Sequence, residues 1–273
     1  MAVNHEAEAM TEGDSTSDRS TSSGPPLPAS IEHAWGLRGR AGRGPRPGLS
    51  LDRIVEAAIS VAGRDGLAAV SMSRVAAELG SAPMSLYRYV ASKDELLALM
   101  VDVAMGAPPP GPPAEQGWRA GMAHWANGAF DAYRRQRWIV RVPITAPPIT
   151  PNQIVWMEAA LVCLRDTGLT EQEKLSTILL ISGYVRSQAM MEVDFAEAVR
   201  AGADPVELAA TYGRTLLRLI DPARFPAVHA AIVSGSLDDE PDHTQADFAS
   251  DELAFGLDRI LDGLEVLVQA RTR

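Results

Sequence analysis

Helix-start signals recur along this chain of 273 residues, and no stretch has the apolar–polar alternation that a half-buried strand requires. Ser50 has a residue type that caps helices well. Ser92 with Glu95, and Thr170 with Glu173, have the spacing of a capping box. Each of these signals is followed by apolar residues three and four positions apart, which is the spacing of a helix face. The chain is therefore predicted to be all-α.

Stretches rich in glycine and proline divide the predicted helices into two groups. The first group is expected at about 51–62, 73–79, 83–90 and 92–105, and the second at about 118–135, 152–166, 171–199, 205–220 and 250–269. The sequence "GAPPPGPPAEQG" between them is typical of a domain boundary. We predict a first domain over 47–105, a second over 106–273, and a disordered extension over 1–46 that is rich in Ser, Thr, Gly and Pro.

Charge is distributed unevenly between these parts. Between Trp35 and Lys93 there are nine Lys or Arg against four Asp or Glu, although the whole chain has 25 against 35. A basic module on an acidic body is expected where one domain contacts a polyanion and the other does not. Arg38, Arg40, Arg43 and Arg46 form a basic arm spaced by glycine and proline. This arm suits a phosphate backbone or a minor groove, although a flexible linker is an equally good interpretation.

The segment "LGSAPMSLYRYVASKDEL", residues 79–96, has the pattern of a helix-turn-helix. Gly80, Ser81 and Ala82 would form the tight turn between two short helices. Leu86 and Val90 are four residues apart and are expected to pack inward. Five side chains would then point outward or along the flanks of the second helix: Met84, Ser85, Tyr87, Arg88 and Tyr89.

The chemistry of these outward side chains suits DNA. Phenol hydroxyls can reach phosphate oxygens, and the ring faces can pack on a sugar or a thymine methyl group. Arg88 can bridge phosphates or bind a guanine edge. Lys93 lies at the start of the next predicted helix, where it could hold a phosphate. Because many helical hairpins imitate this motif, the pattern alone is moderately specific.

Over residues 51–100 the sequence resembles the DNA-binding domain of the TetR family of transcriptional regulators. The resemblance rests on the Gly66-Leu67 turn, Val75-Ala76, Leu79-Gly80 and the run "LYRYVASKDELL". The run "AFGLDRILDGLEVLV", residues 254–268, is similar to the terminal helix of the subgroup nearest the tetracycline repressor. This second resemblance is weaker and covers less of the chain.

The resemblance implies a homodimer whose two DNA-binding heads insert their third helices into successive major grooves of a palindromic operator. The helical body would dimerise through the 171–199 helix and the C-terminal helix, and it would hold an effector whose binding tilts the 92–105 helix. Carried over position by position, DNA contacts are expected at Ser73, Pro83, Met84, Ser85, Tyr87, Arg88, Tyr89 and Lys93. Pro83 and Met84 are apolar where the family often has polar residues, which favours contact with thymine methyl groups.

Aromatic, methionine and polar residues of the central helices are candidates for a small-molecule pocket. They are His124, Trp125, Phe130, Trp138, Trp156, Met157, Tyr184, Arg186, Ser187, Met190 and Met191. Many of them are equally expected as ordinary core. When the tetracycline repressor is laid on this segment, Trp125 falls near a polar position that contacts the drug, so tetracycline itself is not expected as the inducer.

Other classes of site lack support in the sequence. There is no Walker or Rossmann glycine loop and no serine or cysteine nucleophile motif, so neither a cofactor nor catalysis is predicted. His124 and His243 lack the spacing of metal ligands, and the lone Cys163 is expected to be core. No apolar run of about 18 residues and no signal peptide is present, which predicts a cytoplasmic protein without a membrane span.

Together these features predict a ligand-responsive transcriptional repressor that binds double-stranded DNA as a homodimer. A transcriptional activator or dual regulator of the same fold is the main alternative, because the sign of regulation depends on where the operator lies. A helical ligand carrier or enzyme with an incidental N-terminal motif is the alternative from another class.

Overall fold

The computed structural model describes residues 27–37, 48–202, 205–235 and 245–271, and every regular element in them is helical. The α-helices are α1 (Ala29–Ala34), α2 (Leu51–Asp65), α3 (Met72–Glu78), α4 (Pro83–Leu86), α5 (Lys93–Met105), α6 (Gly117–Arg135), α7 (Pro151–Cys163), α8 (Glu171–Arg200), α9 (Pro205–Leu219), α10 (Pro226–Val233) and α11 (Gln245–Arg271). Three 3-10 helices, η1 (Leu67–Ala69), η2 (Ala114–Gln116) and η3 (Arg137–Arg141), complete the described chain. The all-α prediction is confirmed for these residues.

The helices begin where capping side chains satisfy their first amides. The hydroxyls of Ser50, Ser92 and Thr170 each accept a hydrogen bond from the backbone amide three residues later, at 3.1 to 3.3 Å. At Thr170 the capping box is complete, because Glu173 also accepts from the Thr170 amide. At Ser92 it is not complete, because Glu95 accepts from the amide of Ala91 instead.

Several boundaries differ from the predicted ones. The third predicted helix ends at Leu86 instead of about Val90, and the next three residues form turns. The predicted 152–166 helix ends at Cys163. The expected disorder over 1–46 is wrong for residues 29–34, which form α1. The segments α10 and η3 were not expected at all, while the basic arm (38–47) and His243 lie outside the described residues.

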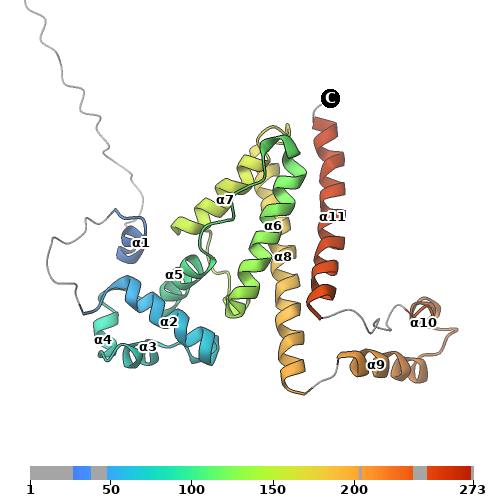
Figure 1. The fold of residues 1–273 in the computed structure, drawn as a ribbon, viewed down its shortest axis with the longest axis horizontal. Coiled ribbons are helices and arrows are strands. Elements are labelled where there is room, and N and C mark those ends of the chain that lie inside the picture. Colours follow the sequence, from blue (N-terminus) through green and yellow to red (C-terminus); the bar gives the residue numbers. More distant parts are fainter. Residues whose placement is uncertain (1–26, 38–47, 203–204, 236–244, 272–273) are drawn as a thin grey trace, which may run out of the picture.

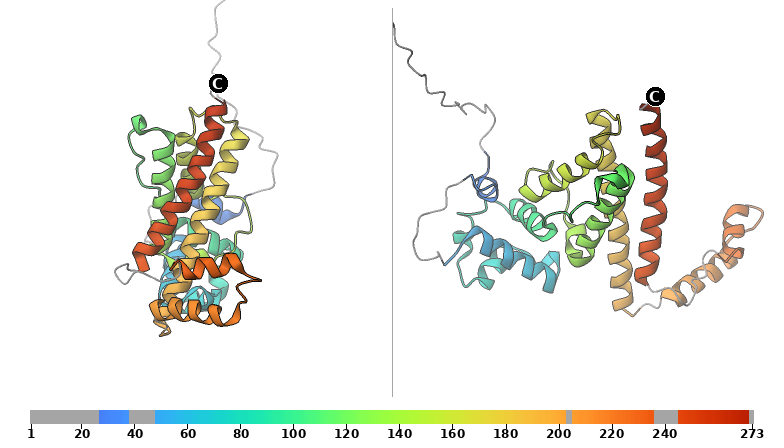
Figure 2. Two further views of the ribbon diagram at one scale, coloured as in Figure 1. Left: turned by 90° about the vertical axis from the view of Figure 1, so that its right-hand side faces the viewer. Right: turned by 45° about the horizontal axis from the view of Figure 1, so that its top comes forward.

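Helices α1 to α4 form a head at one end of the molecule, and α5 leads from it into the body (Figure 1). In the body, α8 and α11 stand side by side on the side that faces away from the head (Figures 1 and 2). The pair α9 and α10 extends outward from the end of α8. In the part of the chain that the structure describes, no helix combines the length and apolar character needed to cross a membrane.

Two hydrophobic cores hold these parts together. The head core contains the apolar faces of α2, α3, α4 and α5, with Ile54, Val75 and Leu86 fully buried. The body core lies between α6, α7, α8 and α11. Trp138 and Ile139 of η3 belong to the head core although they follow a body helix, so η3 joins the two parts.

The junction of α5 and α7 depends on one buried carboxylate. Asp102 of α5 is 4% exposed, and its oxygens accept from the Gln153 amide at 3.1 Å and the Asn152 side-chain amide at 3.2 Å. These donors lie in the first turn of α7, whose cap Thr150 gives no side-chain hydrogen bond. Asp102 therefore does for α7 what an N-cap side chain normally does, and it fixes α7 to α5.

Replacing this carboxylate is expected to destabilise the fold. Asp102→Ala should lower the free energy of unfolding by about 2–4 kcal/mol, because two donors near the start of α7 lose their acceptor in a buried place. Urea unfolding followed by circular dichroism measures the change. Asp131→Ala, at an exposed position of α6, is the control and should change stability by less than about 0.5 kcal/mol. Equal effects of the two variants would contradict the capping role.

Candidate DNA interface and effector region

The turn between α3 and α4 has the geometry that the helix-turn-helix pattern predicts. Gly80 adopts φ +60°, where a side chain would be strained, and its amide donates to the Ala77 carbonyl at 3.1 Å. The amide of Ser81 donates to the Ala76 carbonyl at 2.9 Å. These bonds close the end of α3 and direct the chain straight into α4.

The inward and outward residues of this segment divide as predicted except at Tyr89. Leu86 and Val90 are fully buried in the head core. Met84 is 74% exposed and Tyr87 is 46% exposed, although both are large and hydrophobic. Ser73, Pro83, Arg88 and Lys93 are exposed as well, and Ser85 is half-buried. Thus α3, α4 and the turn after α4 carry exposed side chains that do not take part in the head core.

Among the described residues, Arg88 and Lys93 take part in no ion pair, whereas Arg64 and Arg74 of the head do. Arg64 of α2 pairs with Glu78 of α3 and with Asp65, each at 3.1 Å, and Arg74 pairs with Asp65 at 3.0 Å. Hydrogen bonds from Arg64 hold the pKa of both carboxyls below their usual values. These two arginines therefore fasten α2 to α3, and Arg88 and Lys93 keep their charge available for an outside partner.

Tyr89 differs from its neighbours. It is half-buried, it packs against the head core, and its hydroxyl donates to the Leu49 carbonyl at 3.1 Å. That bond fastens the chain just before α2 to the end of the helix-turn-helix. The geometry favours a packing role for this tyrosine, and its contact with DNA stays a prediction.

In the effector region, the aromatic candidates lie mainly in the body core. Trp125 of α6 and Trp156 of α7 meet edge to face with ring centroids 5.8 Å apart. The Trp125 indole donates to the Trp156 carbonyl at 2.9 Å, and the Trp156 indole donates to the Gly106 carbonyl at 2.8 Å. Since both indole N–H groups are engaged by the backbone, these residues can offer a ligand only their ring surfaces. Phe130 is buried in the same core, and Met157 is half-buried against it.

Tyr184 of α8 fixes the neighbouring helix α11. Its hydroxyl donates to the Glu252 carbonyl at 2.7 Å, and burial raises the pKa of this phenol. A Cβ atom on Gly256 would lie only 2.1 Å from that hydroxyl oxygen, so any side chain there would displace the Tyr184 ring. Tyr184 therefore belongs to the packing of α8 against α11.

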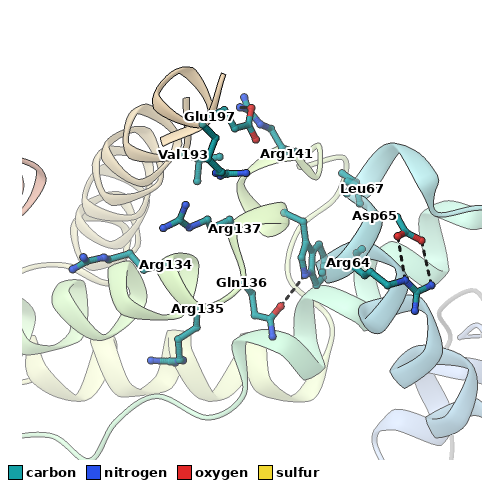
Figure 3. A pocket seen from close by; sticks show the side chains of 15 residues that line it. Arg64, Asp65, Leu67, Arg134, Arg135, Gln136, Arg137, Arg141, Val193 and Glu197 are labelled. Atoms are coloured by element: carbon teal, nitrogen blue, oxygen red, sulfur yellow. Dashed lines mark hydrogen bonds and ion pairs between the residues drawn. The ribbon is translucent and has the colours of Figure 1, made fainter. Parts of the chain in front are cut away.

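The remaining effector candidates do not converge. Trp138 lies in the head core, while Ser187, Met190 and Met191 are exposed on α8. His124 lines a groove of about 280 Å³ beside the segment that leads into α6. Trp138 lines a cleft of about 470 Å³ between the end of α2 and the junction of α6 and η3. Arg134, Arg135 and Arg137 line the same cleft, and Arg64 lines it from α2 while bonded to Asp65 (Figure 3). The eleven residues thus do not form a single cavity.

Two structural residues were missed or misread from the sequence. Asp102 lies three positions after the buried Leu99, and this helical spacing predicts that Asp102 lies on the same buried face of α5. Arg186, expected at the pocket, donates to the Val140 carbonyl at 2.9 Å and also to the Val142 carbonyl. It ties α8 to η3, which reaches into the head core. Within the described ranges no three His, Cys, Asp or Glu side chains gather into a possible metal site, and Cys163 is half-buried.

Comparison with known proteins gives the family. Residues 54–100 match the family described as bacterial regulatory proteins, tetR family, and residues 110–268 match the tetracyclin repressor-like C-terminal domain. The chain is 40% identical over 253 residues to the HTH-type transcriptional repressor DrrR1 of Streptomyces coeruleorubidus, which covers 92% of this chain and 90% of that protein. An HTH-type transcriptional regulator of Saccharopolyspora erythraea is 29% identical over 142 residues, covering 51% of this chain and 59% of that one.

Solved structures agree with this assignment. Apo ActR from Streptomyces coelicolor superposes with a TM-score of 0.64 at 26% identity, over 81% of this chain and 98% of that one. ActR in complex with actinorhodin gives the same TM-score and identity, over 81% and 96% of the two chains. The helix-turn-helix head, the helical body and these matches agree along the chain. The chain belongs to the TetR family of bacterial regulatory proteins.

Proposed function

We propose that the protein is a transcriptional repressor that binds a palindromic operator as a homodimer and is released from it by a small molecule. The observation that carries the proposal is the surface of α3, α4 and the following turn, where Met84, Tyr87 and Arg88 are exposed while Leu86 and Val90 hold the head core. Such a surface fits the major groove. The relative named DrrR1 is itself a repressor, which favours repression over activation.

A second copy of the chain fits the side that faces away from the head. Helices α8 and α11 lie on that side (Figure 2). They carry large apolar side chains that a single chain leaves exposed: Leu175, Leu179, Leu180, Met190, Met191, Phe255 and Val266. Exposed apolar surface of this extent marks an interaction site. Two helices from each copy would form a four-helix bundle, and its twofold axis would match the symmetry of a palindromic operator.

The proposed effector acts in the body, and α5 carries its effect to the head. ActR, which shares this fold, has been solved with actinorhodin. In this chain α5 contributes Leu96 and Met100 to the head core and is bonded to α7 through Asp102. A ligand that shifts α7 would therefore move α5 and the head with it. The distance between the two recognition helices would then depart from the ~34–36 Å of one DNA turn.

Binding to the region upstream of its own gene tests this function. We expect purified protein to shift that DNA sequence-specifically, with log affinity falling linearly as log salt concentration rises, because phosphate contacts release counterions. A compound screen for release of the DNA would then identify the effector. A protein that shows no salt-dependent, sequence-specific binding there, or at any site enriched from genomic DNA, would not be this regulator.

A further inference from the structure

Helix α1 precedes the helix-turn-helix (Figure 1) and contacts both α2 and α5, because His33 lies 3.8 Å from Asp52 of α2 and Ser30 bonds to Glu95 of α5. It is only six residues long, yet Ser30 is 1% exposed and Ile31 is 3% exposed, and Ile31 is part of the head core. A six-residue helix is not stable alone in water, so these tertiary contacts hold it in place. Residues 29–35, which we name the clasp, are therefore an integral part of the head.

The clasp is bonded to the start of α5. The Ser30 hydroxyl donates to one carboxylate oxygen of Glu95. The other oxygen of Glu95 accepts from the Ala91 amide at 2.7 Å, immediately before the cap of α5. The carboxylate of Glu95 therefore bonds both the clasp and the residue just before the cap of α5.

The other end of the clasp is bonded to the body. The indole N–H of Trp35 donates to the Ile149 carbonyl at 2.8 Å, 114 positions further along the chain. Ile149 precedes Thr150, the cap of α7, and the first turn of α7 is itself bonded to Asp102 of α5. The clasp, α5 and the start of α7 therefore form a closed triangle of contacts.

A closed triangle resists a change of angle between its sides. If α5 tilted relative to α7, the Trp35–Ile149 bond would stretch or Ile31 would leave the head core. We propose that the clasp sets the angle between head and body, and hence the half-site spacing that the dimer accepts, with Trp35 and Ser30 as positioning residues. This inference rests on the proposed function, because it concerns how the same operator is recognised.

Operators of altered spacing test the clasp. Trp35→Phe keeps the ring and removes the N–H donor, while Trp118→Phe, at a half-buried body position, is the matched control. We would measure affinity by fluorescence anisotropy for the enriched operator and for versions with one or two base pairs added or removed at its centre. Wild type and Trp118→Phe should discriminate strongly between spacings. In Trp35→Phe the ratio of affinities should fall about two- to tenfold, the effect of losing one hydrogen bond.

The outcomes separate the clasp from the proposed function. If wild type binds with strong spacing preference and Trp35→Phe keeps it unchanged, the clasp inference fails and the repressor stands. If wild type binds no operator, the proposed function itself fails. A change in stability alone would lower affinity for all spacings equally and would also overturn the inference. Ser30→Ala, which breaks the bond to Glu95, is a second test. It should also lower the ratio of affinities between the operator spacings.

Discussion

Tyr87→Ala combined with Arg88→Ala is expected to lower operator affinity more than a hundredfold while leaving the melting temperature unchanged. Both side chains are exposed, and within the described chain Arg88 has no ion pair, so folding does not depend on them. Each contact to a base is worth about 1–3 kcal/mol. The double variant removes two side chains from each head, so a dimer loses four contacts at once. Fluorescence anisotropy with the operator and a thermal melt give the two quantities.

Arg165→Ala is the control for this pair, because it removes an exposed positive charge beyond the end of α7 in the body. It should leave affinity within about twofold, since surface charges away from the interface contribute little. A melting temperature that falls together with affinity would show that Tyr87 and Arg88 support the head's packing. An unchanged operator affinity would show that Tyr87 and Arg88 do not contact the DNA.

Leu179→Glu is expected to convert the dimer to a monomer and to abolish tight operator binding. Leu179 is 74% exposed in the single chain and lies on α8, one of the two helices through which we propose that the chain dimerises. The substitution would place two carboxylates in an apolar interface, one from each copy, and burying an unpaired charge is strongly unfavourable. Sedimentation velocity measures the mass, and circular dichroism should show unchanged helix content because the residue does not support the chain's own core.

Ile144→Glu provides the matched control for the dimer. Ile144 is 77% exposed in the segment between η3 and α7, outside the face formed by α8 and α11. This variant should remain a dimer with operator affinity close to that of the wild type. If Leu179→Glu also remained a dimer at micromolar concentration, the α8–α11 face would not be the dimer interface.

Local chemistry explains which helices could be predicted. The caps at Ser50, Ser92 and Thr170 act within three residues, so the sequence shows them directly. Helix α1 could not be recognised, because six residues in a Ser- and Pro-rich stretch gain their order from Ile31 in a core built elsewhere. Helix α4 ends at Leu86, and the amides of Tyr89 and Val90 both donate to the Leu86 carbonyl, at 2.8 and 3.1 Å, so the chain continues as a tight turn.

The two sites were predictable to different degrees. The DNA surface follows from one short motif, because the burial of Leu86 and Val90 decides where their neighbours point. The effector residues were predicted from their aromatic, methionine or polar side chains. The kind of side chain does not show which face of a helix lines a cavity. Trp125, Trp156 and Tyr184 use their polar atoms on backbone carbonyls, which the sequence does not indicate. Trp138 enters the head core because η3 crosses between the two parts, a tertiary relation without a local signal.

Hydroxyl-radical footprinting of the purified protein on its enriched operator tests dimerisation and DNA recognition by the two heads in one experiment. We expect two protected half-sites of inverted sequence, on one face of the DNA, with centres one helical turn of ~34–36 Å apart. Arg88→Ala should weaken both half-sites equally, because each head uses the same residue. A single protected tract without inverted symmetry, or protection that does not depend on Arg88, would contradict a homodimer that reads DNA through α3 and α4.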